Sequence, residues 1–253
     1  MRPVLFQIGD FKVHSYGVLL VVGLLIAIAF GRKRAARYGF TGSDLSDVAV
    51  WALIPGVLGA RLFFVAQEWG YYKDHVGEIF TKFEGLTSFG GLIFGFLGVV
   101  LWSRATKKPL VPMLDLAGPC FLIAHAVGRV GCLLNGCCYG GSCSLPWGVT
   151  VHDLDGRYHP AQIYDSLMNL GALWLVLLLE KRGLKPGQCL GLSIALHGVA
   201  RFIYEFWRAG TTSTYMGALP ITDAQAMALA ITAAGLVAYY LGGRRPAEPV
   251  PTA

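Results

Sequence analysis

Long apolar segments separated by short polar stretches dominate the chain. About 20 apolar residues are needed for a helix to cross roughly 30 Å of hydrocarbon, and each segment comes near that length. The pattern predicts an all-α integral membrane protein with about seven transmembrane helices and a loop region on its outer face. The seven segments are 13–30, 45–66, 88–102, 110–130, 161–179, 189–207 and 224–241.

The residues inside and between these segments refine the prediction. Pro55 and Gly56 indicate a kink in the second segment. Gly91, Gly95 and Gly98 in the third recur at helical spacing, so they form a small-residue face that favours close helix packing. The longest connections are a polar, aromatic loop over 67–87 and a second loop over 131–160.

Basic residues follow the segments in a way that predicts their orientation. With the N-terminus outside and the C-terminus in the cytoplasm, twice as many Lys and Arg residues fall on the cytoplasmic side as on the outer side. Of the 21 basic residues, Arg61, Arg129 and Arg201 fall within predicted spans, all near the outer end.

Composition supports the membrane interpretation. The chain is 55% hydrophobic and 14% charged, whereas soluble domains carry about 25% charged residues. The net charge of +6 does not indicate a nucleic-acid partner, because the basic residues lie in short runs between apolar segments. The first segment is followed by basic residues rather than a cleavage site, which predicts that it is retained. We expect one membrane domain over 1–243 and a disordered tail over 244–253.

The stretch GRVGCLLNGCCYG at 128–140 carries the first candidate chemistry. Arg129 ends an apolar segment there, where a guanidinium needs an anion, a carboxylate or water. Arginine binds phosphate through two parallel hydrogen bonds, so three arginines near one face predict an anion site. Each arginine has an alternative role, either reaching the interface or pairing with a carboxylate, and Glu205 lies one turn after Arg201.

His14 and Tyr16 lie at the outer end of the first segment. His14 is a candidate proton acceptor, and the alternative is an interfacial residue beside an aromatic belt that includes Tyr16. In HPAQIYD at 159–165, the proline is typical of a helix start. Gln162, Tyr164 and Asp165 then form a polar wall that faces the site in one interpretation.

Four cysteines cluster as C-x4-C-C-x4-C, at Cys132, Cys137, Cys138 and Cys143. This spacing is not the paired C-x2-C of a zinc site, and it predicts no metal. On the outer face, disulfides that pin the loop are expected, and a redox-active pair is the sharper hypothesis. Adjacent cysteines seldom bond each other, so pairings with Cys132 or Cys143 are favoured.

Six motifs in order resemble the prolipoprotein diacylglyceryl transferases of the bacterial inner membrane, over nearly the whole chain. They are HSYG at 14–17, GARLFF at 59–64, FGGLIFG at 89–95, GRVGCLLNGCCYG at 128–140, HPAQIYD at 159–165 and RFIYEFWR at 201–208. The seven-span, N-outside topology agrees with that family.

The resemblance implies transfer of a diacylglyceryl group from phosphatidylglycerol to the lipobox cysteine of a prolipoprotein signal peptide. A thioether forms and glycerol phosphate leaves, with no cofactor, among the lipids of the inner membrane. Positions that the family uses fall on Tyr16, Arg129, Asn135, Gly140, Arg201 and Glu205. We expect Arg129 and Arg201 to bind the phosphate with Asn135 and Tyr16 orienting it, and Arg61 to be a further substrate-binding residue.

Two departures from the family pattern matter. Phe89 stands where the family commonly has histidine, so another base is needed; His14 is the candidate, ahead of Tyr16 and Glu205. Cys132 and Cys137 stand where asparagine and glutamate are frequent. The alternatives are a divergent non-catalytic lipid-binding paralogue and a membrane thiol–disulfide oxidoreductase that uses the four cysteines.

Overall fold

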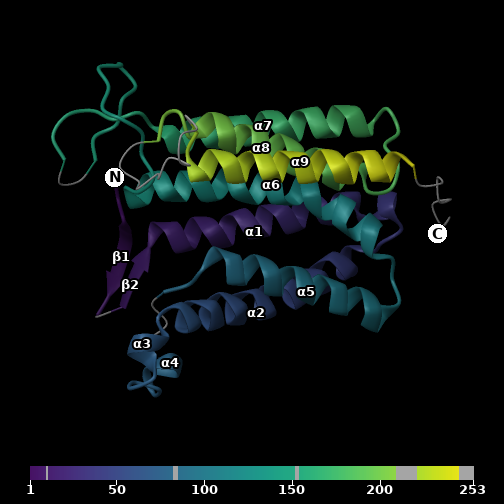
Figure 1. Cartoon of the computed structure of the whole chain (residues 1–253), viewed down its shortest axis with the longest axis horizontal. Helices are drawn as coiled ribbons and strands as arrows, with labels where there is room; N and C mark the ends of the chain where they lie inside the picture. The colour runs from purple at the N-terminus through teal and green to yellow at the C-terminus, as the bar shows by residue number, and fades with distance from the viewer. Residues whose placement is uncertain (10, 82–84, 152–153, 209–220, 245–253) are drawn as a thin grey trace. The chain divides into compact units, whose positions relative to one another are not determined.

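A computed structural model describes residues 1–9, 11–81, 85–151, 154–208 and 221–244 (Figure 1). The chain divides into two compact units. The first unit consists of Met1–Arg34 and Leu114–Ala253, and the second unit is Ala35–Met113. The single domain predicted over 1–243 stays a prediction, and the predicted tail lies, apart from Arg244, outside the described residues.

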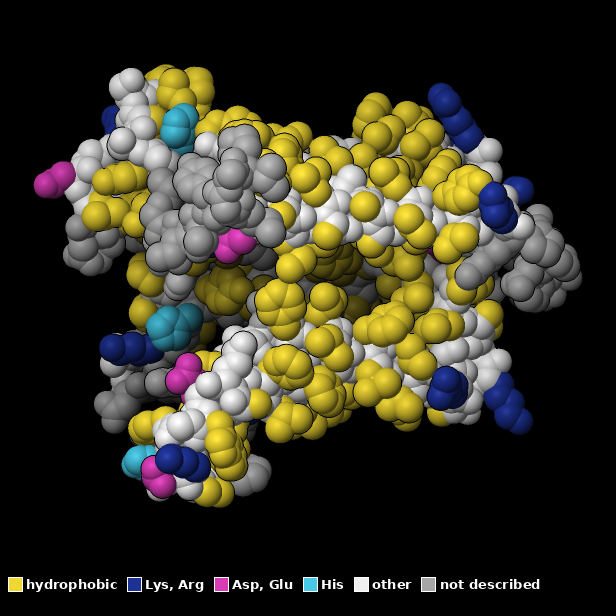
Figure 2. All heavy atoms as spheres, viewed as in Figure 1, with side chains coloured by type: hydrophobic (Ala, Val, Ile, Leu, Met, Phe, Trp, Pro, Cys, Tyr) yellow, Lys and Arg dark blue, Asp and Glu magenta, His cyan; other side chains and the backbone are white. Residues whose placement is uncertain are grey.

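Within the described ranges, six helices are long and apolar enough to cross a membrane, so the chain is a multi-pass membrane protein. Hydrophobic side chains cover the lengths of the long helices, and Lys and Arg gather near their ends (Figure 2). The sixth predicted segment is the helix α8 (Gln188–Tyr204), which has 17 residues. The total of seven spans and the orientation stay predictions. The six helices are Ser15–Tyr38, Gly42–Gln67, Phe89–Thr106, Leu110–Asn135, Ala161–Glu180 and Asp223–Gly243.

The second unit is built on a glycine seam between α2 (Gly42–Gln67) and α5 (Ser88–Thr106). A Cβ added at Gly95 would lie 3.3 Å from the carbonyl oxygen of Ala52, and one at Gly98 would collide with that of Trp51. The small-residue face predicted on the third segment is confirmed. Two short helices, α3 (Trp69–Tyr72) and α4 (Glu78–Thr81), lie in the predicted loop.

Two further seams hold the first unit together. Gly23 of α1 (Ser15–Arg34) packs against α6 (Leu110–Asn135), where an added Cβ would lie 3.1 Å from the carbonyl oxygen of Ala124. Gly198 of α8 packs as closely against Ala228 of α9 (Asp223–Gly243), and α8 and α9 lie side by side in Figure 1. The remaining long helix is α7 (Ala161–Glu180).

Two features near the ends of the helices depart from the predicted segments. The fourth helix was expected to end at 130, but α6 continues to Asn135 and stops where Gly136 adopts a left-handed φ of 77°. Gly131 does not end it, because it packs against Leu19 and Tyr16 of α1. Before α1, the strands β1 (Val4–Ile8) and β2 (Phe11–His14) form an antiparallel hairpin, an addition to the predicted all-α fold.

Candidate functional site

The side chain of Arg129 is held by a buried carboxylate. Its Nε atom lies 2.5 Å from Oδ2 of Asp165, whose side chain is fully buried. His125, one helical turn before Arg129 on α6, places Nε2 at 3.2 Å from the same carboxylate oxygen. A buried charge needs such a partner. Nε of Arg129 makes this contact and also lies 3.4 Å from Nε2 of His125.

A chain of polar contacts continues from Asp165 to α8. Nδ2 of Asn169, one turn later on α7, donates to Oδ1 of Asp165 at 2.8 Å. Oδ1 of Asn169 lies 2.8 Å from Nδ1 of His197. The imidazoles of His125 and His197 meet edge to face, with centroids 4.7 Å apart. Three helices are therefore joined by one hydrogen-bonded network that fixes the rotamer of Arg129.

Tyr204 connects the two predicted phosphate-binding arginines. Its side chain is fully buried at the end of α8, and the guanidinium carbons of Arg129 and Arg201 each lie 4.8 Å from its ring centroid. Nη1 of Arg201 is 2.6 Å from a carboxylate oxygen of Glu205, and Arg208 is 3.7 Å from the same oxygen. The pairing of Arg201 with Glu205 on one helical face is thus present, and both arginines are gathered at one aromatic ring.

Helices α7 and α8 also hold the turn that follows α6. Gln162 of α7 donates from Nε2 to the carbonyl of Cys137 at 2.6 Å, and the hydroxyl of Tyr204 donates to that of Cys138 at 3.0 Å. Gly140 forms an antiparallel bridge with Arg208. An added Cβ at Gly140 would lie 2.7 Å from Cβ of His159, so only glycine fits there.

Three sulphur atoms meet at this turn. The Sγ atoms of Cys132, Cys137 and Cys138 all lie within 4.8 Å of one another, and Cys132 is buried. Cys132, Cys137, Cys138 and Cys143 are reduced thiols, so the expected disulfides are not formed. A hydrogen bond with Cys132, aided by the nearby guanidinium groups of Arg129 and Arg208, lowers the pKa of the Cys138 thiol. Burial raises the pKa of the Cys137 thiol.

Most of the predicted site residues lie in the first unit around this turn. The aromatic ring of Tyr16 approaches Gly131 of α6, one residue before Cys132. Asn135 is the last residue of α6, two residues before Cys137. His14 is exposed at the end of β2, and no described hydrogen bond or ion pair joins it to the two arginines.

Arg61 belongs to the second unit. It is buried there and donates to the backbone carbonyls of Glu78 (3.2 Å), Ile79 (3.3 Å) and Gly85 (3.4 Å), with its guanidinium over the ring of Tyr72. Phe89, also in this unit, is exposed on α5. A role for Arg61 in binding substrate stays a prediction.

The sequence alone predicts no role in the site for Asn169, Tyr204, Arg208, His125 or His197. A signal was present, since His125 and Arg129 are four residues apart, as are His197 and Arg201. Residues four apart share one helical face, so they face the same partners. What the spacing does not show is that a third helix supplies Asp165 and Asn169 between them.

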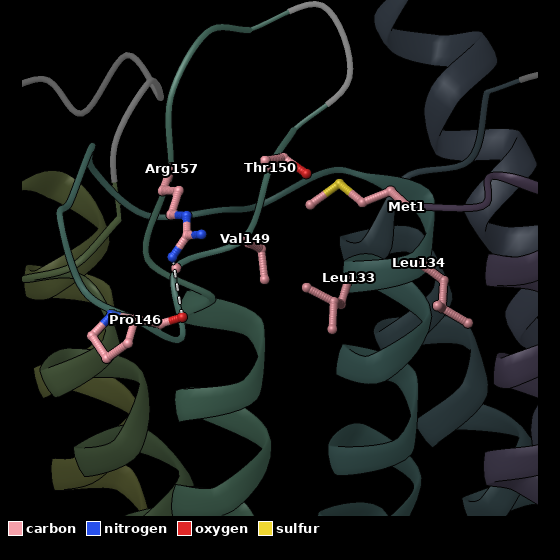
Figure 3. A pocket seen from close by; sticks show the side chains of 8 residues that line it. Met1, Leu133, Leu134, Pro146, Val149, Thr150 and Arg157 are labelled. Atoms are coloured by element: carbon pink, nitrogen blue, oxygen red, sulfur yellow. Dashed lines mark hydrogen bonds between the residues drawn. The ribbon is translucent and has the colours of Figure 1, made fainter.

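A cavity of 460 Å³ lies beside the turn, between the end of α6 and the following loop (Figure 3). Leu133, Val149 and Met1 give it an apolar lining, and on one side of it Arg157 donates to the carbonyl of Pro146 at 3.2 Å. An apolar cavity with one guanidinium group suits an amphipathic ligand at the membrane surface.

These features define a multi-pass membrane protein with a buried arginine site at the end of its helices. The family described as prolipoprotein diacylglyceryl transferase matches residues 3–241, and the chain belongs to that family.

Three relatives, each named phosphatidylglycerol–prolipoprotein diacylglyceryl transferase, match almost the full length. The protein from Finegoldia magna is 31% identical over 94% of both chains, and that from Clostridioides difficile is 30% identical over 94% of both. The protein from Gloeobacter violaceus is 31% identical over 97% of this chain and 94% of its own.

Proposed function

We propose that this chain transfers the diacylglyceryl group of phosphatidylglycerol to the lipobox cysteine thiol of prolipoproteins in the bacterial inner membrane. The transfer forms a thioether and releases glycerol phosphate. Family membership supports the reaction. The observation that carries the site assignment is the convergence of Arg129 and Arg201 on the buried ring of Tyr204.

The arrangement suits a phosphate that becomes a leaving group. Asp165 engages Nε of Arg129, and Glu205 engages Nη1 of Arg201. A guanidinium group has five N–H donors, so each arginine can contact its carboxylate and also donate to a phosphate oxygen. As the carbon–oxygen bond breaks, negative charge grows on the phosphate, and prearranged donors stabilise it most at that point.

Tyr16 and Asn135 are the candidates for orienting the lipid. The ring of Tyr16, on α1, lies next to Gly131 of α6. Asn135 is the last residue of α6, two residues before Cys137. Both are therefore on the loop side of Arg129 along α6. The backbone at Gly140 passes between His159 and Trp207. A side chain at position 140 would displace both residues.

The acceptor must react as a thiolate, because the neutral thiol is a poor nucleophile. His14 is exposed near the start of α1 and is the proposed general base. Glu205 is a weaker candidate because Arg201 and Arg208 both engage its carboxylate. Tyr16 is the other candidate.

A transfer assay in proteoliposomes tests the proposal. Purified protein receives phosphatidylglycerol and a lipobox peptide, and the peptide mass is followed for a diacylglyceryl adduct. We expect an adduct with the wild-type chain and a loss of about 1,000-fold in Arg129→Ala. Arg182→Ala, which replaces an exposed arginine after α7, is the matched control. Wild-type rates in Arg129→Ala would contradict the site assignment, and no adduct from folded wild-type protein would contradict the reaction.

A further inference from the structure

The thiol cluster of Cys132, Cys137 and Cys138 has no part in the mechanism above. We propose that it is a three-thiolate site for a thiophilic cation such as Zn²⁺, with a fourth position that takes the acceptor thiol of the peptide. The second half of this proposal rests on the proposed transfer reaction. The first half, metal binding, stands on the geometry of the cluster alone.

The backbone brings the three sulphur atoms together. Cys132 lies on the last turn of α6, and the left-handed Gly136 reverses the chain so that the amide of Cys137 donates to the carbonyl of Cys132 at 3.1 Å. Cys138 itself has a φ of 63°, which non-glycine residues rarely adopt. Such strain persists where the surroundings enforce it, and it is concentrated at functional sites.

The surroundings that enforce this conformation are buried. Gln162 and Tyr204 are both fully buried, and each donates to a carbonyl of the turn, at Cys137 and Cys138 respectively. These bonds come from α7 and α8, so two helices fix the positions from which two of the thiols project. The outer partners of a metal site typically hold its ligands in this way.

The separation and chemistry of the sulphur atoms fit a soft cation. Thiolates bound to Zn²⁺ at about 2.3 Å in tetrahedral geometry lie about 3.8 Å apart. The three Sγ atoms lie within 4.8 Å of one another, so small side-chain rotations would bring them to that separation. Three thiolates leave a bound Zn²⁺ with one negative charge.

A three-ligand zinc site has an open fourth position. A thiol that coordinates a cation loses its proton outright, here to the general base proposed above, and becomes a thiolate beside the arginine site. Its sulphur then forms the bond to the glyceryl carbon while the carbon–oxygen bond to phosphate breaks. Glycerol phosphate leaves with that electron pair.

Metal binding is measured first, on the full chain in detergent, reduced with a phosphine and freed of metal with a chelator. Titration with Co²⁺ gives thiolate-to-cobalt charge-transfer absorption if sulphur ligates. We expect one ion per chain, displaced by Zn²⁺, and at least a tenfold loss of affinity in Cys137→Ser and Cys138→Ser. Cys143→Ser, from the same loop but outside the cluster, is the control. No absorption from folded, reduced protein, or equal affinity in all three variants, would overturn the site.

Two further measurements separate the metal's role from the reaction itself. A lipobox peptide added to the cobalt form should shift the absorption, whereas a peptide with serine for cysteine should not; equal spectra would overturn ligation by the substrate. Adduct formation is then compared with and without Zn²⁺. We expect at least a tenfold gain with Zn²⁺. Equal rates would overturn the metal's part in catalysis, and no adduct under either condition would instead contradict the proposed function.

Discussion

Arg129 in the first unit and Arg61 in the second are both largely buried, but they bind different partners. Arg129 contacts the carboxylate of Asp165 within a network that spans three helices. Arg61 donates to three carbonyls of the segment between α2 and α5, those of Glu78, Ile79 and Gly85, and packs on Tyr72. The position of the Arg129 guanidinium therefore depends on the side chains around it. The Arg61 guanidinium instead binds the backbone of a loop.

The difference shows how to separate a ligand site from a structural arginine. Backbone carbonyls are present whatever the sequence, so an arginine that binds them serves the fold. A carboxylate that is itself held by Asn169 and His125 positions a cation at a defined point. Such positioning is needed where a second anion must bind next to it. We therefore expect substitutions in the two units to affect different properties.

The largest expected effect distinguishes the two arginines directly. Arg129→Lys should slow transfer by about 100- to 1,000-fold, because the point charge of lysine lacks the planar, paired donors with which arginine binds a phosphate beside Asp165. Arg61→Lys should stay within about threefold of the wild-type rate, since an ammonium group still donates to carbonyls. The adduct assay measures both. Equal losses of transfer rate in the two variants would contradict the assignment of different roles to Arg129 and Arg61.

A smaller effect is expected from the partner of Arg129. Asp165→Asn keeps the side-chain shape but turns an amide or an uncharged oxygen toward the guanidinium. Transfer should fall by about 10- to 100-fold through misplacement of Arg129, with the main change in kcat. Asp155→Asn, an exposed position in the loop after α6, is the control. An unchanged kcat in folded Asp165→Asn protein would show that the network does not position the arginine.

The smallest effect on catalysis is expected from Arg61→Ala. The carbonyls of Glu78, Ile79 and Gly85 lose a donor, which costs about 1–3 kcal/mol in the free energy of unfolding. The rate per folded molecule should not change. Thermal unfolding in detergent, compared with Arg104→Ala at an exposed position of α5, measures the loss. Full stability combined with impaired transfer would instead place Arg61 in substrate binding.

Hydropathy predicted the long helices well, because apolar length is a property of the sequence itself. The helix predicted over 161–179 is Ala161–Glu180, and the glycine face of the third segment packs as expected. Ends were less predictable. The predicted fourth helix ends just before Gly131. Because Gly131 has no side chain, it packs closely against Tyr16, and α6 continues to Asn135.

The candidate site was predicted in part. Arg129, Arg201 and Glu205 come together because two of them share α8, and i,i+4 spacing makes that contact local. Asp165 and Tyr204 could not be placed by spacing, since their roles depend on how α7 and α8 pack. The linear C-x4-C-C spacing likewise concealed the approach of the three sulphur atoms, which requires two left-handed residues, Gly136 and Cys138.

The seam between α8 and α9 also restricts how a lipid can travel. At Gly191, Gly198 and Gly235 the two backbones approach so closely that even a methyl group would collide with the facing helix. An acyl chain is far wider than a methyl group, so it cannot pass between these helices unless they separate along their whole length. Phosphatidylglycerol must therefore reach Arg201 by a route that does not cross the α8–α9 edge, and that edge is a closed wall of the first unit.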